Sequence, residues 1–154
     1  MASDAKGEGI RNLDEQLCFA VYSTAHAFNR LYRPFLTELG LTYPQFLAML
    51  VLWERDGQTV TAIGDRLMLD SGTLTPLLKR LEASGLIARA RSRDDERRVL
   101  VHLTAEGRAL RGKAGAARNA VPCAVEDSGV EKERLLADVL SLRGALRRAV
   151  EAEG

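Results

Sequence analysis

The sequence is poor in the residues that build metal sites and disulfide frameworks. Its 154 residues include only two cysteines, Cys18 and Cys123, and two histidines, His26 and His102. No CxxC or HxxxH spacing occurs, which excludes the common structural zinc motifs, so we expect neither a metal nor a cofactor. In a reducing cytoplasm the two cysteines would not form a permanent disulfide. They are therefore either inert buried thiols or redox-active ones.

Long apolar runs and an excess of one charge are also missing. No stretch approaches the roughly 18 consecutive apolar residues of a transmembrane helix, and "MASDAKGEGIRN" lacks the apolar core of a signal peptide. We therefore expect a cytoplasmic protein with no membrane partner. The formal net charge is +1, so binding to nucleic acid must be argued from local basic patches. With 46% hydrophobic and 28% charged residues, the chain is predicted to form one compact domain.

The N-terminal quarter of the chain predicts a tail and a long helix. Residues 1–11 are polar and predict a flexible tail. Residues 12–40 have apolar positions three and four apart, with Asn12 and Glu15 as a capping box and Gly40 as the C-terminal cap. A second apolar stripe lies on a neighbouring face of this helix. We therefore expect the helix to be buried on two sides, as in an oligomer interface.

The first part of the segment 41–103 predicts three further helices. The first begins with a capping box at Thr42 and is apolar nearly all round, so it lies at the centre of the core. A short second helix follows Thr59, and the third begins near Asp70. Pro76 lies inside that third helix, where we expect it to kink the helix or to confine its regular part.

The C-terminal third of the chain predicts two more helices. The first is expected to end near Asn119, since the following stretch is rich in small residues and is interrupted by Pro122. Cys123 then falls on an irregular link. A last amphipathic helix covers about residues 130–149. The helical dimerisation region is thus predicted to comprise residues 12–40 and 104–154.

Two short helices followed by a hairpin predict a winged helix-turn-helix within residues 41–103. After the second short helix, the period changes to that of strands at residues 86–90 and 99–103. In this fold the second helix enters the DNA major groove, and the hairpin tip reaches an adjacent minor groove. The sequence therefore predicts a mainly α protein with a small β-wing that binds double-stranded DNA.

The predicted recognition helix carries short hydroxyl side chains where it would meet base edges, and basic side chains one turn later. The hairpin "RARSRDDERR" holds five arginines, and arginine gains from the negative potential of a narrow minor groove. We predict that Arg97 inserts there, with Asp95 holding its guanidinium in a fork. Seen alone, such a hairpin is equally often a solvated surface. The predicted DNA-binding residues are Asp70, Ser71, Thr73, Thr75, Lys79, Arg80, Asp95 and Arg97.

The first predicted helix sets Cys18 in a stripe with tyrosines. Tyr22 lies one turn from Cys18 and can reach it within the chain, whereas Tyr32 is 14 residues away, or about 21 Å along a helix. Tyr32 can therefore meet only the Cys18 of a second, antiparallel chain, and Tyr43 would come from that same partner. Their hydroxyls are suitable donors to a thiolate. The alternative is an inert cysteine in a dimer core, and His26 is more simply an interface or surface residue than a base.

Two parts of the sequence resemble a known family. "LDSGTLTPLLKRLEASGLI", followed by "DDERRVLVHLTAEG", resembles the MarR family of winged-helix repressors. The cysteine of "EQLCFAVYS", with Tyr32 and Tyr43 at their present spacing, resembles the organic hydroperoxide-sensing OhrR members of that family. The resemblance covers the chain from about residue 13 to its C-terminus.

The resemblance implies a redox-sensing repressor, not an enzyme, which binds operator DNA with two-fold half-sites as a homodimer. Cys18 would be the cysteine that an organic hydroperoxide oxidises, with Tyr22, Tyr32 and Tyr43 stabilising its thiolate. Cys123 matches the resolving cysteine of a two-cysteine class, which would close an intersubunit disulfide and release DNA. The apolar approach for an organic peroxide would be formed by Phe19, Phe35 and Phe46.

Two other functions stay open at this point. A repressor of the same family that binds a small aromatic effector would leave Cys18 incidental. A thiol peroxidase would use the same cysteine. However, the sequence lacks the Pro/Thr-rich loop that surrounds a peroxiredoxin cysteine, and the winged-helix segment would then be unexplained.

Overall fold

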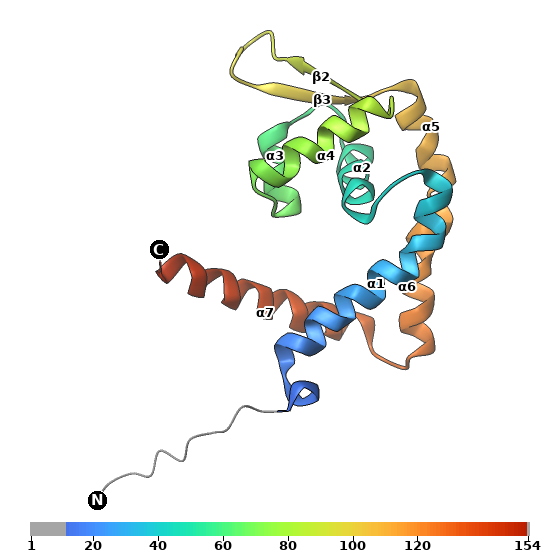
Figure 1. The fold of residues 1–154 in the computed structure, drawn as a ribbon, viewed down its shortest axis with the longest axis vertical. Coiled ribbons are helices and arrows are strands. Elements are labelled where there is room, and N and C mark those ends of the chain that lie inside the picture. Colours follow the sequence, from blue (N-terminus) through green and yellow to red (C-terminus); the bar gives the residue numbers. More distant parts are fainter. Residues whose placement is uncertain (1–11, 154) are drawn as a thin grey trace, which may run out of the picture.

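The computed structural model describes residues 12–153 as helices around one three-stranded sheet (Figure 1). The predicted mainly α class with a small β-wing is confirmed. The predicted strands agree with the structure to within one residue, apart from a short first strand that the sequence does not indicate. The elements are η1 Leu13–Glu15, α1 Leu17–Leu39, α2 Tyr43–Glu54, β1 Gln58–Thr59, α3 Val60–Leu67, α4 Ser71–Ala83, β2 Ile87–Arg91, β3 Val99–Leu103, α5 Ala105–Lys113, α6 Gly115–Asp127 and α7 Lys132–Glu153.

The core lies between α2, α3, α4 and the sheet. Strand β3 is central and pairs antiparallel with β1 on one side and with β2 on the other. Helix α2 is apolar nearly all round and lies in the core, as predicted, with seven of its twelve residues buried; Tyr43, Leu47 and Leu50 on its remaining face are half-buried. Each large side chain that is fully buried there contributes about 1.5–3 kcal/mol to folding. The largest fully buried side chains are Phe46, Met49, Leu52, Ile63, Leu74, Leu78, Leu81, Ile87 and Val101.

Side-chain caps begin three helices where the sequence predicts them. Thr42 and Gln45 form a reciprocal capping box at the start of α2, with bonds of 2.8 and 3.4 Å. The Thr59 hydroxyl accepts a backbone N–H bond at the start of α3, and the Asp70 carboxylate does so at the start of α4. Gly40 ends α1 with a φ of 67°, a left-handed conformation that glycine adopts without strain.

Pro76 does not interrupt α4, which continues as helix from Ser71 to Ala83. The prediction that this proline confines the regular part of the helix is therefore wrong. Proline cannot donate a bond to the carbonyl four residues earlier, which here belongs to Gly72. Gly72 is exposed in the first turn of α4, so water can bond that carbonyl. The buried Leu77 and Leu78 hold the following turn against the core.

Helix α1 begins later than predicted. Residues Leu13–Glu15 form a separate 3-10 turn, and Gln16 is extended with φ −87° and ψ 119°. Asn12 makes no side-chain cap bond, so the predicted capping box with Glu15 is wrong; the backbone carbonyl of Asn12 accepts the Glu15 N–H instead. As a result, Cys18 is the second residue of α1 and lies in its first turn.

The C-terminal helices differ from the prediction in their bounds. Helix α5 ends at Lys113, and α6 continues through Pro122 for its full length. The predictions of a helix end near Asn119 and of an irregular link at Cys123 are therefore wrong. Alanines, which favour helix, fill the first turns of α6. Packing side by side with α1 then stabilises the rest of the helix (Figure 1).

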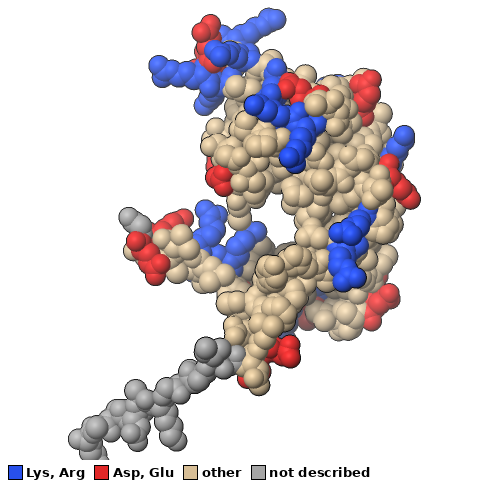
Figure 2. Space-filling view, viewed as in Figure 1, with Lys and Arg blue, Asp and Glu red and all other residues tan. Residues whose placement is uncertain are grey.

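Helix α7 extends away from the rest of the protomer (Figure 1). None of its residues is buried, and a gap separates it from the winged-helix part in the space-filling view (Figure 2). Within residues 12–153, no single helix is long and apolar enough to cross a bilayer. Helices α1 and α2 pass that test only as a pair bent by 69°, and α2 lies in the core.

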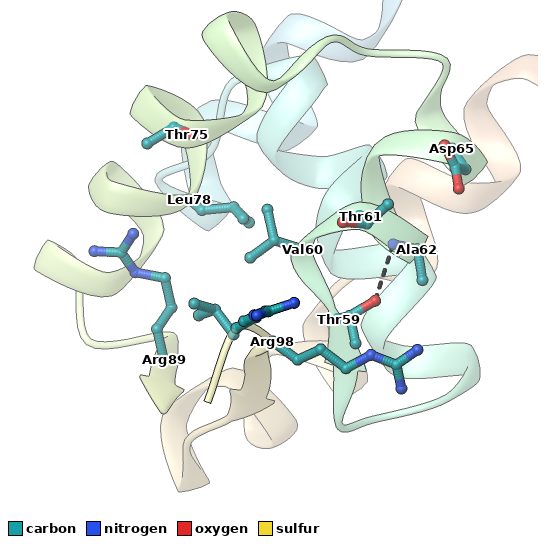
Figure 3. Close-up of a pocket in the computed structure, with 11 residues that line it drawn as sticks. Thr59, Val60, Thr61, Ala62, Asp65, Thr75, Leu78, Arg89 and Arg98 are labelled. Carbon is teal, nitrogen blue, oxygen red and sulfur yellow. Dashed lines mark hydrogen bonds between the residues drawn. The ribbon is translucent and has the colours of Figure 1, made fainter. Parts of the chain in front are cut away.

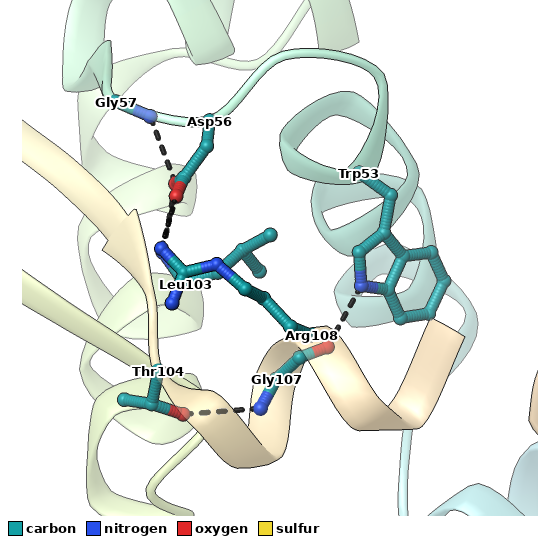
Figure 4. A network of polar contacts seen from close by, with 7 residues as sticks. All are labelled: Trp53, Asp56, Gly57, Leu103, Thr104, Gly107 and Arg108. Atoms are coloured by element: carbon teal, nitrogen blue, oxygen red, sulfur yellow. Dashed lines mark hydrogen bonds and ion pairs between the residues drawn. The ribbon is translucent and has the colours of Figure 1, made fainter. Parts of the chain in front are cut away.

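The base of the wing is bonded to α2 and α5 (Figure 4). The Asp56 carboxylate accepts the N–H of the next residue, the N–H of Leu103 and the Arg108 guanidinium, each at 2.8 Å. Burial raises the pKa of Asp56, but these bonds together outweigh it and hold the pKa below its ordinary value of 3.8. Trp53 Nε1 donates to the carbonyl oxygen of Gly107 at 2.8 Å. These contacts hold α2, β3 and α5 together.

Candidate nucleic-acid interface and thiol site

Basic side chains gather over the wing, at the end of the molecule opposite the N-terminal part of α1 (Figure 2). Arg91, Arg93, Arg97 and Arg98 are all exposed. The hairpin projects beyond the body of the protein (Figure 1). Long cationic side chains on a projecting hairpin are suited to the phosphates and minor groove of a duplex.

A cavity of about 530 Å³ lies between α3, α4 and the wing (Figure 3). Its apolar lining includes Val60 of α3 and Leu78 of α4, which lie next to each other where the two helices face one another (Figure 3). The rest of its lining is largely polar and comes from both helices and both wing strands. The polar and charged residues of this lining are Thr59, Thr61, Asp65, Thr75, Arg89, Arg97 and Arg98.

The first turn of α4 is organised by Asp70. Its carboxylate accepts the Thr73 N–H at 2.9 Å and the Thr73 hydroxyl at 3.2 Å, and these bonds lower the pKa of Asp70. The Thr73 hydroxyl is thus turned toward the cap, while Thr75 faces the cavity. The other predicted recognition-helix residues, Ser71, Lys79 and Arg80, are exposed on α4. Their contacts with DNA stay predictions.

The predicted fork between Asp95 and the Arg97 guanidinium is wrong. The Asp95 carboxylate accepts the backbone N–H of Arg97 at 3.0 Å, and its other oxygen lies 3.9 Å from the Arg98 guanidinium. A residue two positions along a tight turn presents its amide to an Asp side chain more readily than its own side chain. Arg97 therefore has its backbone held by Asp95, and the residue is part of the cavity lining.

Sequence reasoning missed the fork that the structure contains. Glu82, in the last turn of α4, accepts the Arg89 Nε and Nη2 at 3.0 and 2.7 Å on one carboxylate oxygen. Its other oxygen accepts the backbone N–H of Arg89 at 3.1 Å. The available signal was an acid at the C-terminal end of a helix, where the helix dipole disfavours negative charge. Such an acid suggests a specific cationic partner.

Cys18 is exposed in the first turn of α1. Tyr22, one turn later, is also exposed, and its ring packs edge-on against His26 with centroids 4.4 Å apart. Among the described residues, no hydrogen bond joins Cys18 to a tyrosine. A shallow groove on this face of α1 is lined by Phe19, Tyr22, Ser23, His26, Ala27 and Arg30.

Tyr32 and Tyr43 lie together on one protomer. Their ring centroids are 4.9 Å apart, and Tyr32 also packs against the buried Phe46 at 5.9 Å. Burial raises the pKa of both phenols, and the neighbouring Tyr43 adds to the effect on Tyr32. Both hydroxyls therefore remain protonated donors at neutral pH. Phe46, 1% exposed, backs this pair, and Phe35 is half-buried beside the core.

Cys123 is exposed near the C-terminal end of α6. Helix α6 packs along α1, so the two thiols lie on neighbouring helices. Within the described chain, no group of three or more His, Cys, Asp or Glu side chains is arranged to hold a metal ion. Both thiols are exposed on the single protomer.

The chain matches known transcriptional regulators along most of its length. Residues 30–113 match the family model described as transcriptional regulator SarA/Rot. The chain is 54% identical over 136 residues to the HTH-type transcriptional regulator TtmR of Methylorubrum extorquens, covering 88% of this chain and 70% of that protein. It is 52% identical over 102 residues to the organic hydroperoxide resistance transcriptional regulator of Bacillus subtilis, covering 66% of this chain and 69% of that protein.

Solved structures share the fold. Reduced AbfR of Staphylococcus epidermidis bound to DNA matches with a TM-score of 0.74 at 35% identity, covering 90% of this chain and 94% of that chain. AbfR with a disulfide formed matches with a TM-score of 0.63 at 35% identity, covering 87% and 92%. The helix-turn-helix, the arginine-rich wing and these relatives agree with the predicted resemblance. The chain belongs to the MarR family of winged-helix regulators, and it is a DNA-binding transcriptional regulator rather than an enzyme.

Proposed function

We propose that the protein is a redox-sensing repressor that binds operator DNA as a homodimer and releases it when an organic hydroperoxide oxidises Cys18. The observation that carries the proposal is the contact between the Tyr32 and Tyr43 rings on one protomer. Cys18 and Tyr32 are 14 residues apart on α1, or about 21 Å along its axis. The two phenols can therefore serve only the Cys18 of a second subunit.

Exposed apolar faces on α1 and α7 support a dimer. A helix of 22 residues with none buried is not stable by its own packing, and contiguous exposed apolar surface is typical of an interface. These residues fall within the predicted dimerisation region, 12–40 and 104–154. The exposed large apolar residues of its two parts are Leu13, Leu17, Val21, Tyr22, Val130, Leu135, Leu136, Val139, Leu140, Leu146 and Val150.

In the proposed dimer, hydrogen-bond donors would surround the Cys18 sulfur. The first turn of a helix presents unpaired N–H groups and the positive end of the helix dipole, which favour negative charge. Tyr32 and Tyr43 of the partner would donate hydrogen bonds to the sulfur, because their raised pKa values keep them protonated. Tyr22 would do so from the same chain. The aromatic rings of Tyr32 and Tyr43 of the partner would also favour an apolar organic peroxide over the more polar hydrogen peroxide.

The proposed chemistry has two steps. The Cys18 thiolate attacks the outer oxygen of the hydroperoxide, so the O–O bond breaks, the sulfur becomes a sulfenic acid, and an alcohol leaves after gaining a proton. The Cys123 thiolate of the partner then attacks the sulfenic sulfur, so an S–S bond forms, the S–O bond breaks, and the leaving hydroxide gains a proton from solvent and departs as water. The two alpha carbons must come within roughly 7 Å for that bond. Since Cys123 lies on a helix, the end of α6 would have to shift or unwind.

Such a shift would reach the wing through existing contacts. Helix α6 follows α5 after a single residue, and α5 is bonded to α2 and to the base of β3 through Trp53, Asp56 and Arg108 (Figure 4). Moving α6 would therefore rotate the winged-helix parts of the two subunits. Half-sites on a duplex lie about 34–36 Å apart, so a changed spacing would lower operator affinity.

The names of the relatives support the same function. The Bacillus subtilis relative is an organic hydroperoxide resistance regulator. AbfR is described in reduced, overoxidised and disulfide-formed states, the first two bound to DNA. Together, these names and the thiols on α1 and α6 favour a cytoplasmic regulator that responds to oxidation of its own cysteine.

Replacing Cys123 by serine tests the proposed disulfide. After treatment with cumene hydroperoxide, the wild type should run on a non-reducing gel as a dimer band that dithiothreitol removes. Cys123→Ser should run only as a monomer band. In a DNA-shift assay without small thiols, this variant should be released less completely than the wild type. A dimer band that persists in Cys123→Ser, or in Cys18→Ser, would contradict the proposed pairing.

A further inference from the structure

Glu82 connects α4, the predicted recognition helix, to the wing through its contacts with one residue, Arg89. It lies in the last turn of α4, and its carboxylate holds both the side chain and the backbone N–H of Arg89, the third residue of β2. Strand β2 is an edge strand of the sheet, and β3 pairs with it along one side. Among the described residues, the side that faces α4 has no neighbouring strand. The Arg89 N–H therefore points away from the sheet toward α4. One carboxylate thus contacts both the backbone of β2 and the Arg89 guanidinium.

The fork lies at the wall of the cavity between the two DNA-contacting elements. Arg89 lines that cavity together with Thr75 of α4 (Figure 3), and Arg97 of the wing is also part of its lining. The side chains of Glu82 and Arg89 are 36% and 25% exposed, so the pair is neither fully solvated nor sealed in the core. The width of this space must suit the distance from a major groove to the adjacent minor groove.

Charge alone does not explain an acid at this place. Glu82 lies in the last turn of a helix, where the dipole disfavours a negative charge. If this end of α4 comes near the phosphates of a bound duplex, a carboxylate there also repels the DNA. The fork provides a specific partner for the charge, because hydrogen bonds from the side chain and backbone of Arg89 lower the pKa of Glu82.

We propose that Glu82 is a positioning residue for sequence discrimination. It fixes the wing against the recognition helix so that both reach their grooves together, and it restrains Arg89 beside them. The inference rests on the operator binding proposed above and does not involve the thiols. Without the fork, the wing can still bind phosphates through its arginines, but it no longer meets one particular duplex in register.

Electrostatics and positioning predict opposite results for the loss of Glu82. If the carboxylate only repels DNA, its removal raises the affinity for every duplex. If it positions the wing, its removal lowers the affinity for the preferred duplex but not for others. The ratio of the two affinities therefore separates the explanations, and a purely stabilising ion pair would change the melting temperature without changing that ratio.

The experiment compares Glu82→Ala and Glu82→Gln in the full-length reduced protein. The probes are a duplex enriched from a random library by the wild type and a scrambled duplex of the same composition, measured by fluorescence anisotropy at one salt concentration. We expect Glu82→Ala to lower the affinity for the enriched duplex about tenfold and to leave or raise that for the scrambled duplex. Glu82→Gln keeps one acceptor oxygen and should lie between.

Glu96→Gln is the matched control, because it removes an exposed wing carboxylate that makes no ion pair among the described residues. It should raise both affinities to a similar extent. If Glu82→Ala behaves like Glu96→Gln, or keeps the wild-type ratio of affinities, the role given to Glu82 is overturned. A wild type that enriches no sequence would instead contradict operator binding itself.

Discussion

Cys18→Ser should still bind operator DNA but should need on the order of a hundredfold more organic hydroperoxide for release. Serine is nearly isosteric with cysteine, so the exposed first turn of α1 should keep its structure. Its hydroxyl is not ionised at neutral pH and cannot form a sulfenic acid, so the first oxidation step is lost. A DNA-shift titration with cumene hydroperoxide measures the effect directly.

The wild type and Cys123→Ser serve as controls in that titration. Both keep the thiol that reacts with peroxide, so both should form a sulfenic acid that a dimedone probe detects, whereas Cys18→Ser should not. If hydroperoxide releases Cys18→Ser as readily as the wild type, the thiol on α1 is not the sensor. A regulator that responds to a small aromatic effector would then be the better explanation.

Gly107→Ala should destabilise the protein by about 3 kcal/mol, at the upper end of overpacking effects. A Cβ on Gly107 would lie 2.0 Å from the carbonyl oxygen of Leu86, far inside van der Waals contact. That oxygen cannot move freely, because it accepts the Thr104 N–H at 3.1 Å. Thermal unfolding at a fixed protomer concentration should show a melting temperature about 10 °C lower.

Gly112→Ala is the control on the same helix. A Cβ there meets nothing within 4 Å, so alanine should be neutral or stabilise α5 by up to about 1 kcal/mol. Trp53 is the only tryptophan and donates to the Gly107 carbonyl, so its fluorescence should change in Gly107→Ala and not in Gly112→Ala. Equal melting temperatures for the two variants would contradict the close packing of α5 on Leu86.

Much of the fold could be predicted because its signals are local. The capping residues Thr42, Thr59 and Asp70 each lie next to the helix that they begin, and their bonds span only three residues. The change to strand periodicity is equally local. In contrast, α6 continues through Pro122 because it packs along α1, and β1 exists because it pairs with β3. Neither contact is visible in the local sequence.

The site was predicted unevenly for the same reason. Residues one turn apart, such as Cys18 and Tyr22, can be placed from spacing alone. The pair of Tyr32 and Tyr43 is consistent with the prediction that both serve one partner thiol, because the turn between α1 and α2 brings their rings together. The pair of Glu82 and Arg89 was not predicted, because the turn between α4 and β2 brings these two residues together.

The central claim is that one thiol site is built from two subunits. Mixed dimers test it, with one subunit carrying Cys18→Ser and the other carrying Tyr32→Phe and Tyr43→Phe. If the tyrosines act across the interface, such a dimer has one complete site, with the only Cys18 facing the intact phenols of its partner. If they act within a chain, it has none.

The measurement is the rate at which Cys18 is oxidised by cumene hydroperoxide in these mixed dimers. In the homodimer with both Tyr→Phe changes, the loss of two hydrogen bonds to a charged sulfur should slow oxidation by about tenfold or more. We expect the mixed dimer to react at close to the wild-type rate per thiol. A mixed dimer as slow as the Tyr→Phe homodimer would contradict the shared site.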